Sequence, residues 1–266
     1  MTAISIGPLV FAGDRLAAVI GIASYLLVTT ILGRGLRPGL MSTASWALTA
    51  GLIGARLGHV ALNWASFSQE PLRLFAVWQG GFEPVSGVLS ALVVSAFTVR
   101  CVRSGVSIVA AIAIGVVVWM GANELAKASL GKSAPTIALQ RLDGAPMAIS
   151  DARGTPAVVN LWATWCPPCR REMPLLARSA AENDSVIFLF VNQVEGPAKI
   201  KAYLQMEGLK LDTVLMDTAG QVPRHYQTAG IPVTLFLHAD GTLANMHVGE
   251  ISPETLQTNI AEISRQ

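Results

Sequence analysis

The sequence predicts a multi-domain chain in which an N-terminal all-α transmembrane helix bundle precedes a C-terminal α/β domain. Hydrophobic residues make up 52% of the 266 residues and charged residues only 14%, and most of the charge lies after Gly121. Beyond that point, short apolar runs alternate with helix-forming runs, which is typical of a sheet covered by helices. The net charge of +2 gives no reason to expect a nucleic-acid partner.

Four apolar segments in the first half, 16–32, 44–65, 85–99 and 106–122, could each form a membrane-spanning helix. Each is close to the ~20 residues that a helix needs to cross ~30 Å of hydrocarbon. Buried helices of a soluble domain are the alternative, but four in succession with so few charges favour a membrane. We therefore expect a transmembrane domain over 1–125, a short polar linker over 126–135 and a second domain over 136–266.

Basic residues in the short loops predict the orientation. Arg34 and Arg37 follow the first apolar segment, and Arg100 and Arg103 follow the third. The positive-inside rule places both pairs in the cytoplasm, so both termini lie on the other side. The N-terminus has neither a basic n-region nor an obvious cleavage site, so we expect no removable signal peptide. We expect a multi-pass protein of the bacterial inner membrane, with its C-terminal domain in the periplasm.

The motif Trp-Cys-Pro-Pro-Cys at 165–169 lies between an apolar, β-branched run at 157–161 and a helix-forming run. A strand therefore brings Cys166 to a helix N-terminus, where unpaired N–H groups and the helix dipole stabilise a thiolate. Cys169 follows one turn later, close enough to close a disulfide. Pro167 and Pro168 fit the first helical turn, which needs no N–H from them. This placement suits redox chemistry.

Half of a structural zinc site is the competing interpretation of Cys-x-x-Cys. Such a site needs two further ligands at short spacing. Cys101 is far away, and His225, His238 and His247 are scattered along the chain. We therefore favour the redox interpretation, and we expect neither a metal nor a cofactor.

Residues 133–266 resemble the TlpA and ResA type of thioredoxin-like thiol–disulfide oxidoreductases. The resemblance rests on Trp162, the motif at 165–169, Glu172, Pro174 and Gly230-Ile231-Pro232. It implies a thioredoxin fold with the helix–strand insertion of that type, here a helix over 198–208 and a strand over 213–216. The other expected elements are a hairpin of 136–140 and 147–149, strands at 157–163 and 186–191, a helix to about 182, a hairpin of 232–237 and 242–248, and a helix over 253–263.

The same resemblance implies the site residues. Cys166, Cys169 and Pro232 would be catalytic, with a cis peptide bond before Pro232. A plain trans bond is the alternative. The substrate-positioning residues would be Trp162, Trp165, Pro167, Pro168 and Ile231, with the two tryptophans shaping the surface around the sulfurs.

Asn160 departs from minimal thioredoxins, which have a buried aspartate six residues before the first cysteine. An amide cannot move the proton of the second cysteine by ionising. Glu172, three residues beyond Cys169, could transfer that proton instead, or it could be an exposed residue favoured by the helix dipole. A peroxidase would need threonine or serine three residues before Cys166, where this chain has Ala163.

The N-terminal half resembles prolipoprotein diacylglyceryl transferases. Arg56-Leu57-Gly58 matches part of the family's Gly-Arg-Leu-Gly motif. Gly80-Gly81-Phe82 resembles the start of its second motif, Gly-Gly-Met-Ser-Phe-His-Gly-Gly. The histidine of that second motif aligns with Val85, and the later segment with the essential arginine and asparagine is absent. We expect a degenerate anchor. Arg56 and His59 lie one turn apart and either bind lipid or simply reach the headgroups.

The expected function is reduction of disulfides in extracytoplasmic proteins, with apocytochromes among the candidate substrates. Cys101 is the only cysteine of the membrane half. A dithiol relay across the membrane is therefore excluded, and electrons must come from a separate membrane donor of the DsbD/CcdA type. A disulfide-forming oxidase, a lipid-modifying protein with a redox sensor, and a non-enzymatic holdase or scaffold remain as alternatives.

Overall fold

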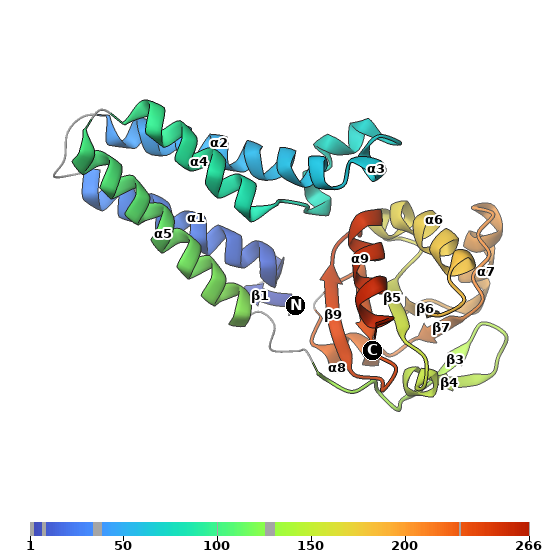
Figure 1. Ribbon diagram of the computed structural model, residues 1–266. Coiled ribbons are helices and arrows are strands. Elements are labelled where there is room, and N and C mark those ends of the chain that lie inside the picture. Colours follow the sequence, from blue (N-terminus) through green and yellow to red (C-terminus); the bar gives the residue numbers. More distant parts are fainter. Residues whose placement is uncertain are drawn as a thin grey trace. The chain divides into compact units, whose positions relative to one another are not determined.

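The computed structural model describes residues 3–6, 9–33, 39–99, 101–125, 131–228 and 230–265 (Figure 1). It divides into two compact units, one of Asp14–Leu125 and one of Met1–Gly13 with Ala126–Gln266. Arg34, Arg37 and Arg100, on which the predicted orientation partly rests, lie outside the described residues, as does 126–130 of the predicted linker.

A helix forms at each of the four predicted apolar segments, as Figure 1 shows: α1 (Gly13–Gly33), α2 (Leu40–Leu62), α4 (Pro84–Thr98) and α5 (Val102–Leu125). Helix α2 ends earlier than predicted, with Asn63 as its C-cap, and both the backbone N–H and the side chain of Asn63 donate to the His59 carbonyl, at 3.1 and 2.9 Å. Five short elements of this half were not predicted: α3 (Trp64–Phe67), η1 (Pro71–Phe75), η2 (Val77–Gln79), and the two strands of an antiparallel hairpin before α1, β1 (Ala3–Ile6) and β2 (Leu9–Ala12).

Only two of these helices, among the described residues, are both long and apolar enough to cross a membrane. They are Arg15–Gly33, with a mean hydropathy of 2.1, and Val102–Leu125, with 2.3. In the most apolar 18 residues of each helix, only 22% and 17% of the residues are buried, whereas a core helix of a soluble protein is mostly buried. Helix α4 is apolar but has 15 residues, about 22 Å of helix against ~30 Å of hydrocarbon. The expectation of four full-length spans is therefore met for two.

Helices α2 and α4 approach closely through small residues. A Cβ built on Gly54 would lie 2.5 Å from Ser90 Cβ, and one built on Gly58 would lie 2.5 Å from Ser86 Cβ. Real carbon atoms do not come this near, so glycine is required at both positions for the helices to pack at this distance. Such small-residue contacts are typical of helix pairs in membranes.

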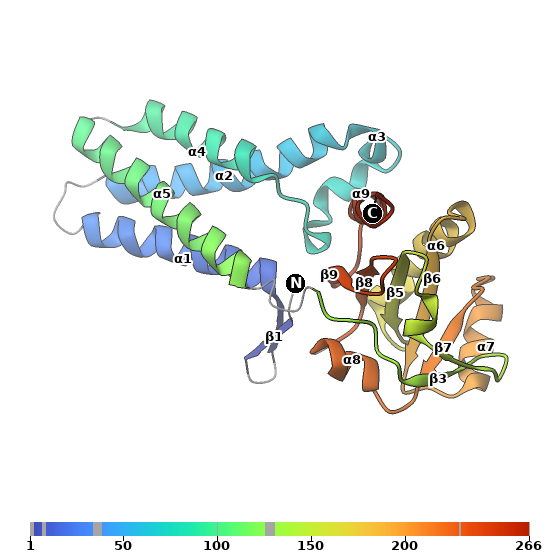
Figure 2. The same ribbon diagram turned by 60° about the horizontal axis from the view of Figure 1, so that its bottom comes forward.

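The second unit contains a seven-stranded sheet in the order β4-β3-β7-β6-β5-β8-β9, which Figure 2 shows from β9 across to β3. Strands β5, β6 and β7 are parallel to one another, and the outer pairs are antiparallel. All six residues of β5 are buried, as a central strand covered on both faces requires. The strands are β3 (Ala138–Arg141), β4 (Pro146–Ala148), β5 (Ala157–Trp162), β6 (Ile187–Gln193), β7 (Val214–Asp217), β8 (Val233–Leu237) and β9 (Leu243–Val248).

Helices cover this sheet on both faces. Helices α6 (Pro167–Glu182), α7 (Pro197–Met206) and α9 (Pro253–Ile263) contribute to the hydrophobic cluster that includes Trp162 and both active-site cysteines. The cluster on the opposite face receives α8 (Gln221–Tyr226) and η3 (Ile149–Ala152). The predicted hairpins, strands and helices of this domain are confirmed, including the α7–β7 insertion. Helix α8 was missed because it is short and contains Pro223.

Candidate active site

Strand β5 and helix α6 place the two cysteines where the sequence predicts. Cys166 is the N-cap residue of α6, and it forms a disulfide with Cys169 in the first turn. Cys166 is 3% exposed and Cys169 is fully buried. A partner molecule can therefore reach the first sulfur only over a small area, and the second sulfur not at all.

At the start of α6, one backbone N–H meets the Cys166 sulfur. The N–H of Cys169 meets Cys166 Sγ at 3.3 Å, and the N–H of Arg170 is bonded to the Cys166 carbonyl at 3.1 Å. Pro167 and Pro168 occupy the two positions between, and proline has no N–H. Within the part of the chain that the structure describes, one backbone N–H thus points at this sulfur.

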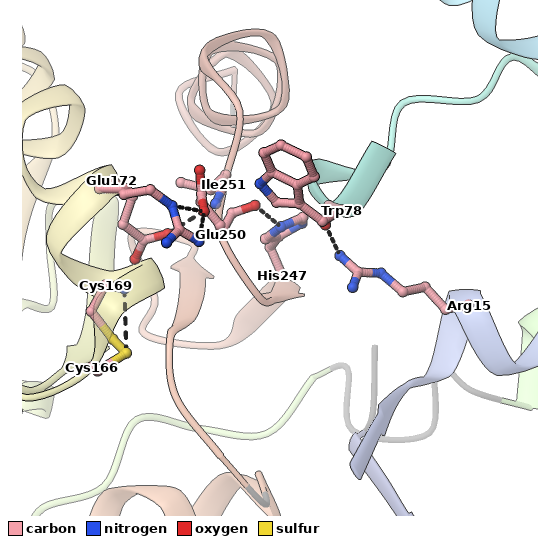
Figure 3. Close-up of polar contacts among 9 residues, drawn as sticks. Arg15, Trp78, Cys166, Cys169, Glu172, His247, Glu250 and Ile251 are labelled. Carbon is pink, nitrogen blue, oxygen red and sulfur yellow. Dashed lines mark hydrogen bonds and ion pairs between the residues drawn. A yellow bond between two sulfur atoms is a disulfide. The ribbon is translucent and has the colours of Figure 1, made fainter. Parts of the chain in front are cut away.

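Glu172 lies one turn after Cys169 on the same helix, as Figure 3 shows. It is 2% exposed, so the expectation of an exposed, dipole-stabilised residue is wrong. Its carboxyl group accepts hydrogen bonds from Asn160 Nδ2 at 2.8 Å and from the Ile251 N–H at 2.9 Å. Burial raises the pKa of Glu172 to about 8, against the opposing effect of these two bonds.

The loop that follows β9 closes this side of the site. Glu250 pairs with Arg171, whose Nε donates to Oε2 at 2.7 Å, and the His247 ring nitrogen lies 3.2 Å from the Glu250 carbonyl (Figure 3). Glu250 also raises the pKa of Glu172, and Arg171 lowers it, each less than burial does. The loop therefore supplies a backbone N–H and one charged neighbour, Glu250, to Glu172, and helix α6 supplies the other, Arg171.

The two tryptophans lie in different environments. Trp165 is 61% exposed beside Cys166, which fits the expected role in contacting a partner. Trp162 is fully buried in the cluster that contains both cysteines, and its ring packs 5.6 Å from that of Tyr203. The expectation that Trp162 shapes the surface is wrong, because Trp162 is the last residue of a strand that is covered on both faces. It packs in the core beneath the two cysteines.

The peptide bond between Ile231 and Pro232 is cis, as the resemblance implies. Pro232 is buried, and its carbonyl accepts from the Gly249 N–H at 2.9 Å. Ile231 is partly exposed and packs against the cluster that holds Cys166 and Cys169. The structure thus brings Ile231 to the cluster that holds both cysteines. Pro167 is exposed and Pro168 partly so.

A second buried carboxylate, missed in the sequence, lies behind the turn that precedes Cys166. Glu195 accepts hydrogen bonds from the backbone and hydroxyl of Thr164, both at 2.7 Å, and from Asn192 Nδ2 at 2.9 Å. Burial raises its pKa, but the bonds from Lys199, Thr164 and Asn192 together hold the pKa of Glu195 below its ordinary value. A glutamate just after a strand is usually a surface residue, and nothing in the sequence around Glu195 indicated that it is buried.

In the N-terminal unit, Arg56 and His59 both face the segment that connects α3 to α4. Arg56 is buried, and its guanidinium donates to the carbonyls of Arg73, Leu74, Gly80 and Gly81 at 2.7–3.0 Å. Both alternatives for this pair, lipid binding and reach to the headgroups, stay predictions. Elsewhere in this unit the Arg15 side chain donates to the Trp78 carbonyl at 2.7 Å (Figure 3).

The remaining cysteine is remote in sequence from the pair. Cys101 Sγ lies 3.1 Å from Ser104 Oγ near the start of α5. Across the described residues, no three His, Cys, Asp or Glu side chains form a group that could hold a metal ion.

Two family models match this chain, one in each half. The AhpC/TSA family matches residues 130–246, and the Prolipoprotein diacylglyceryl transferase family matches residues 2–127. The second match, together with the two apolar helices, indicates a membrane protein.

Curated relatives align with the C-terminal half. The thioredoxin-like protein YneN of Bacillus subtilis is 28% identical over 134 residues, which is 49% of this chain and 78% of YneN. The thiol-disulfide oxidoreductase ResA of Geobacillus kaustophilus is 27% identical over 164 residues, 60% of this chain and 94% of ResA.

Solved structures align with the same half. DsbF of MTB is 25% identical with a TM-score of 0.46, over 49% of this chain and 99% of that one. A secreted Mycobacterium tuberculosis disulfide oxidoreductase is 28% identical with a TM-score of 0.43, over 47% of this chain and 95% of that one. The C-terminal half is a thioredoxin-like thiol–disulfide oxidoreductase domain of the ResA type with the pair Cys166–Cys169, matched by the AhpC/TSA family model, and the N-terminal half is matched by the prolipoprotein diacylglyceryl transferase model.

Proposed function

We propose that this protein is a membrane-anchored reductase of disulfides in extracytoplasmic proteins. In this proposal residues 1–125 form a multi-pass anchor in the bacterial inner membrane, 126–135 a linker, and 136–266 a redox domain in the periplasm. The apolar helices α1 and α5 and the match of the N-terminal half to a membrane enzyme family support the anchor. The likeness of the C-terminal half to the thiol-disulfide oxidoreductase ResA supports disulfides as the substrates, and we propose apocytochromes or similar proteins as their carriers.

The proposed reaction is a two-step exchange. The Cys166 thiolate attacks one sulfur of the partner disulfide, forms a mixed disulfide and releases the other partner sulfur as a thiolate. Cys169 then attacks Cys166 Sγ, which frees the second partner sulfur and leaves Cys166–Cys169 oxidised. The partner gains two electrons and two protons. Glu172 accepts the proton of Cys169, since its pKa of about 8 is close to that of a thiol.

One observation favours reduction over oxidation. The prolines at 167 and 168 leave the Cys169 N–H as the backbone donor to Cys166 Sγ, and they add no histidine beside it. A thiolate with so few donors is only weakly stabilised, and the reduced form of a strong oxidant must be stabilised strongly. This pair should therefore release electrons readily.

A separate donor must then restore the dithiol. We propose a membrane donor of the DsbD/CcdA type, because Cys101 is the single cysteine of the N-terminal half and a relay needs two. The donor would reach Cys166 over the same small exposed area as the substrate.

The test is the reduction potential of the full chain in detergent, equilibrated against dithiothreitol or glutathione buffers. Alkylated peptides that contain Cys166 and Cys169 report the redox state, so Cys101 does not interfere. We expect a potential near that of thioredoxin, about −270 mV. A potential near that of DsbA, about −120 mV, would make the protein a donor of disulfides and overturn the proposal. A Cys166→Ser variant should show no exchange with a disulfide peptide.

A further inference from the structure

The turn immediately before Cys166 is held from behind by a residue of another element. The Cys166 N–H donates to the Ala163 carbonyl at 3.3 Å, so Thr164 and Trp165 are the central residues of the turn. Trp165 projects outward, whereas Thr164 is buried. The direction of this turn sets how the Trp165 ring and Cys166 Sγ face an approaching molecule.

Glu195 binds both polar groups of Thr164. Its Oε2 accepts from the Thr164 N–H and its Oε1 from the Thr164 hydroxyl, each at 2.7 Å. Asn192 Nδ2 donates to Oε2 at 2.9 Å, and Lys199 Nζ forms an ion pair with Oε1 at 2.7 Å. A buried carboxylate is costly unless it is fully bonded, and this one has four donors. Two of the four belong to the turn beside Cys166.

The backbone before Glu195 is strained. Val194 has a φ of 59°, in the left-handed region that a β-branched residue rarely adopts, and its side chain is exposed. This kink lies between the end of β6 and the start of α7, at the point where the chain turns to bring Glu195 inward. Such strain persists only when the surroundings determine it, and it is concentrated at functional sites.

We propose that Glu195 is a positioning residue for the exchange reaction, holding the 163–166 turn so that Cys166 Sγ meets a partner disulfide in line. This inference rests on the proposed function. Cys166 is only slightly exposed, and sulfur exchange requires three sulfur atoms in a row, so a modest rotation of the turn would close the approach. Glu195 acts through Thr164 and touches neither sulfur.

A purely structural role would have different consequences. If Glu195 only stabilised the fold, its loss would lower the melting temperature and slow every reaction of Cys166 alike. If it positions the turn, a bulky disulfide substrate should be affected far more than a small alkylating reagent, because iodoacetamide also reacts in line but is small enough to reorient in front of the thiolate. The ratio of the two rates therefore separates the two roles.

The experiment uses the reduced full chain in detergent, with Cys101→Ser in every version. The second-order rate of Cys166 is measured with iodoacetamide and with a synthetic peptide closed by one disulfide. The variants are Glu195→Ala, Glu195→Gln, Thr164→Val and the double variant Thr164→Val with Glu195→Ala. Glu207→Gln is the matched control, since Glu207 is a partly exposed glutamate paired with Arg170 outside the turn.

For Glu195→Ala we expect peptide reduction to fall on the order of tenfold or more, while the rate with iodoacetamide stays within about twofold. Glu195→Gln and Thr164→Val should lie between this variant and wild type. The double variant should be no slower than Glu195→Ala, because both changes break the same contact.

Equal slowing of both reagents, or an unchanged peptide rate in an active protein, would overturn the inference. An inactive wild type would instead refute the proposed reductase itself. Thr164→Val keeps the carboxylate and the backbone bond, so it reports on the turn even if Glu195→Ala does not fold.

Discussion

Asn160 and Glu172 share a hydrogen bond of 2.8 Å beside the disulfide, one from strand β5 and one from helix α6. Minimal thioredoxins carry a carboxyl group on the strand, at the position of Asn160. Here the strand supplies an amide and the helix supplies the carboxyl group to the same region. Asn160 cannot ionise, so in the proposed reaction the proton of Cys169 goes to Glu172.

Glu172→Gln should slow the resolution step. The carboxyl group must be ionised to accept the Cys169 proton, so the wild-type rate should rise with pH through about 8. The variant should lack this rise and be slower by roughly a hundredfold above that pH. The rate at which Cys169 releases a trapped peptide from Cys166, followed by quenched flow from pH 6 to 9.5, measures this. Among the described residues Asn160 Oδ1 has no hydrogen-bond partner, so the amide can rotate to accept from the new side chain.

The same substitution should change stability in a defined direction. A raised pKa means that the folded protein holds this proton more tightly than the unfolded chain, so stability falls as pH rises from about 4.5 towards 8. Glu172→Gln is always neutral, and its melting temperature should therefore exceed that of wild type above pH 8. Glu207→Gln, which changes a glutamate in contact with neither Asn160 nor Ile251, should leave the pH dependence unaltered. A steeper loss in the Gln variant would contradict the assignment.

The sequence could identify the chemistry of this site but not the burial of its acids. The Cys-x-x-Cys spacing, the helix start and the cis-proline motif are local, and all three are found as predicted. Glu172 is buried by the Ile251 loop, 79 residues later, and Glu195 by a turn 31 residues earlier. Such contacts depend on the packed sheet, and no local pattern reports them.

At the scale of elements, the pair α2–α4 depends on the absence of side chains. Gly54 and Gly58 face Ser90 and Ser86 at distances that admit no Cβ. Apolarity alone predicted that these segments are helices, but it could not predict their contact, because the packing face is made of glycine and serine rather than large apolar residues. It also overestimated the spans, since α4 is too short.

Gly54→Leu should separate this pair of helices. The added side chain overlaps Ser90, and overpacking of this kind typically costs about 1–3 kcal/mol. We expect a lower melting temperature in detergent and faster proteolysis between α2 and α4. Gly121→Leu is the matched control, because a Cβ at Gly121 meets nothing within 4 Å on the same kind of helix. Equal behaviour of the two variants would show that the close approach of α2 and α4 is not needed.

At the scale of the whole molecule, the two units require different surroundings. The N-terminal unit exposes many large apolar side chains along its helices, whereas the C-terminal unit buries its apolar residues on both faces of one sheet. A lipid environment removes the first exposure from water. The predicted orientation rests on Arg103 and on three arginines outside the described residues, so it stays a prediction.

Cys101 provides a built-in probe of that orientation. In a variant with Cys166→Ser and Cys169→Ser it is the sole cysteine, at a predicted cytoplasmic helix end. A membrane-impermeant maleimide should leave it unlabelled in intact cells with a permeabilised outer membrane, and label it after lysis. Asp240→Cys, on an exposed turn of the redox domain, should be labelled before lysis. The reverse pattern would place the redox domain in the cytoplasm.

Because the two sulfurs differ in exposure, mixed disulfides with other proteins can form at only one of them. Every covalent complex must begin at Cys166, because Cys169 has no exposed surface from which to start one. The inner sulfur serves only to end such complexes. A Cys169→Ser chain should therefore stay disulfide-bonded to each protein that it attacks, and the proteins found linked to Cys166 would identify its natural substrates.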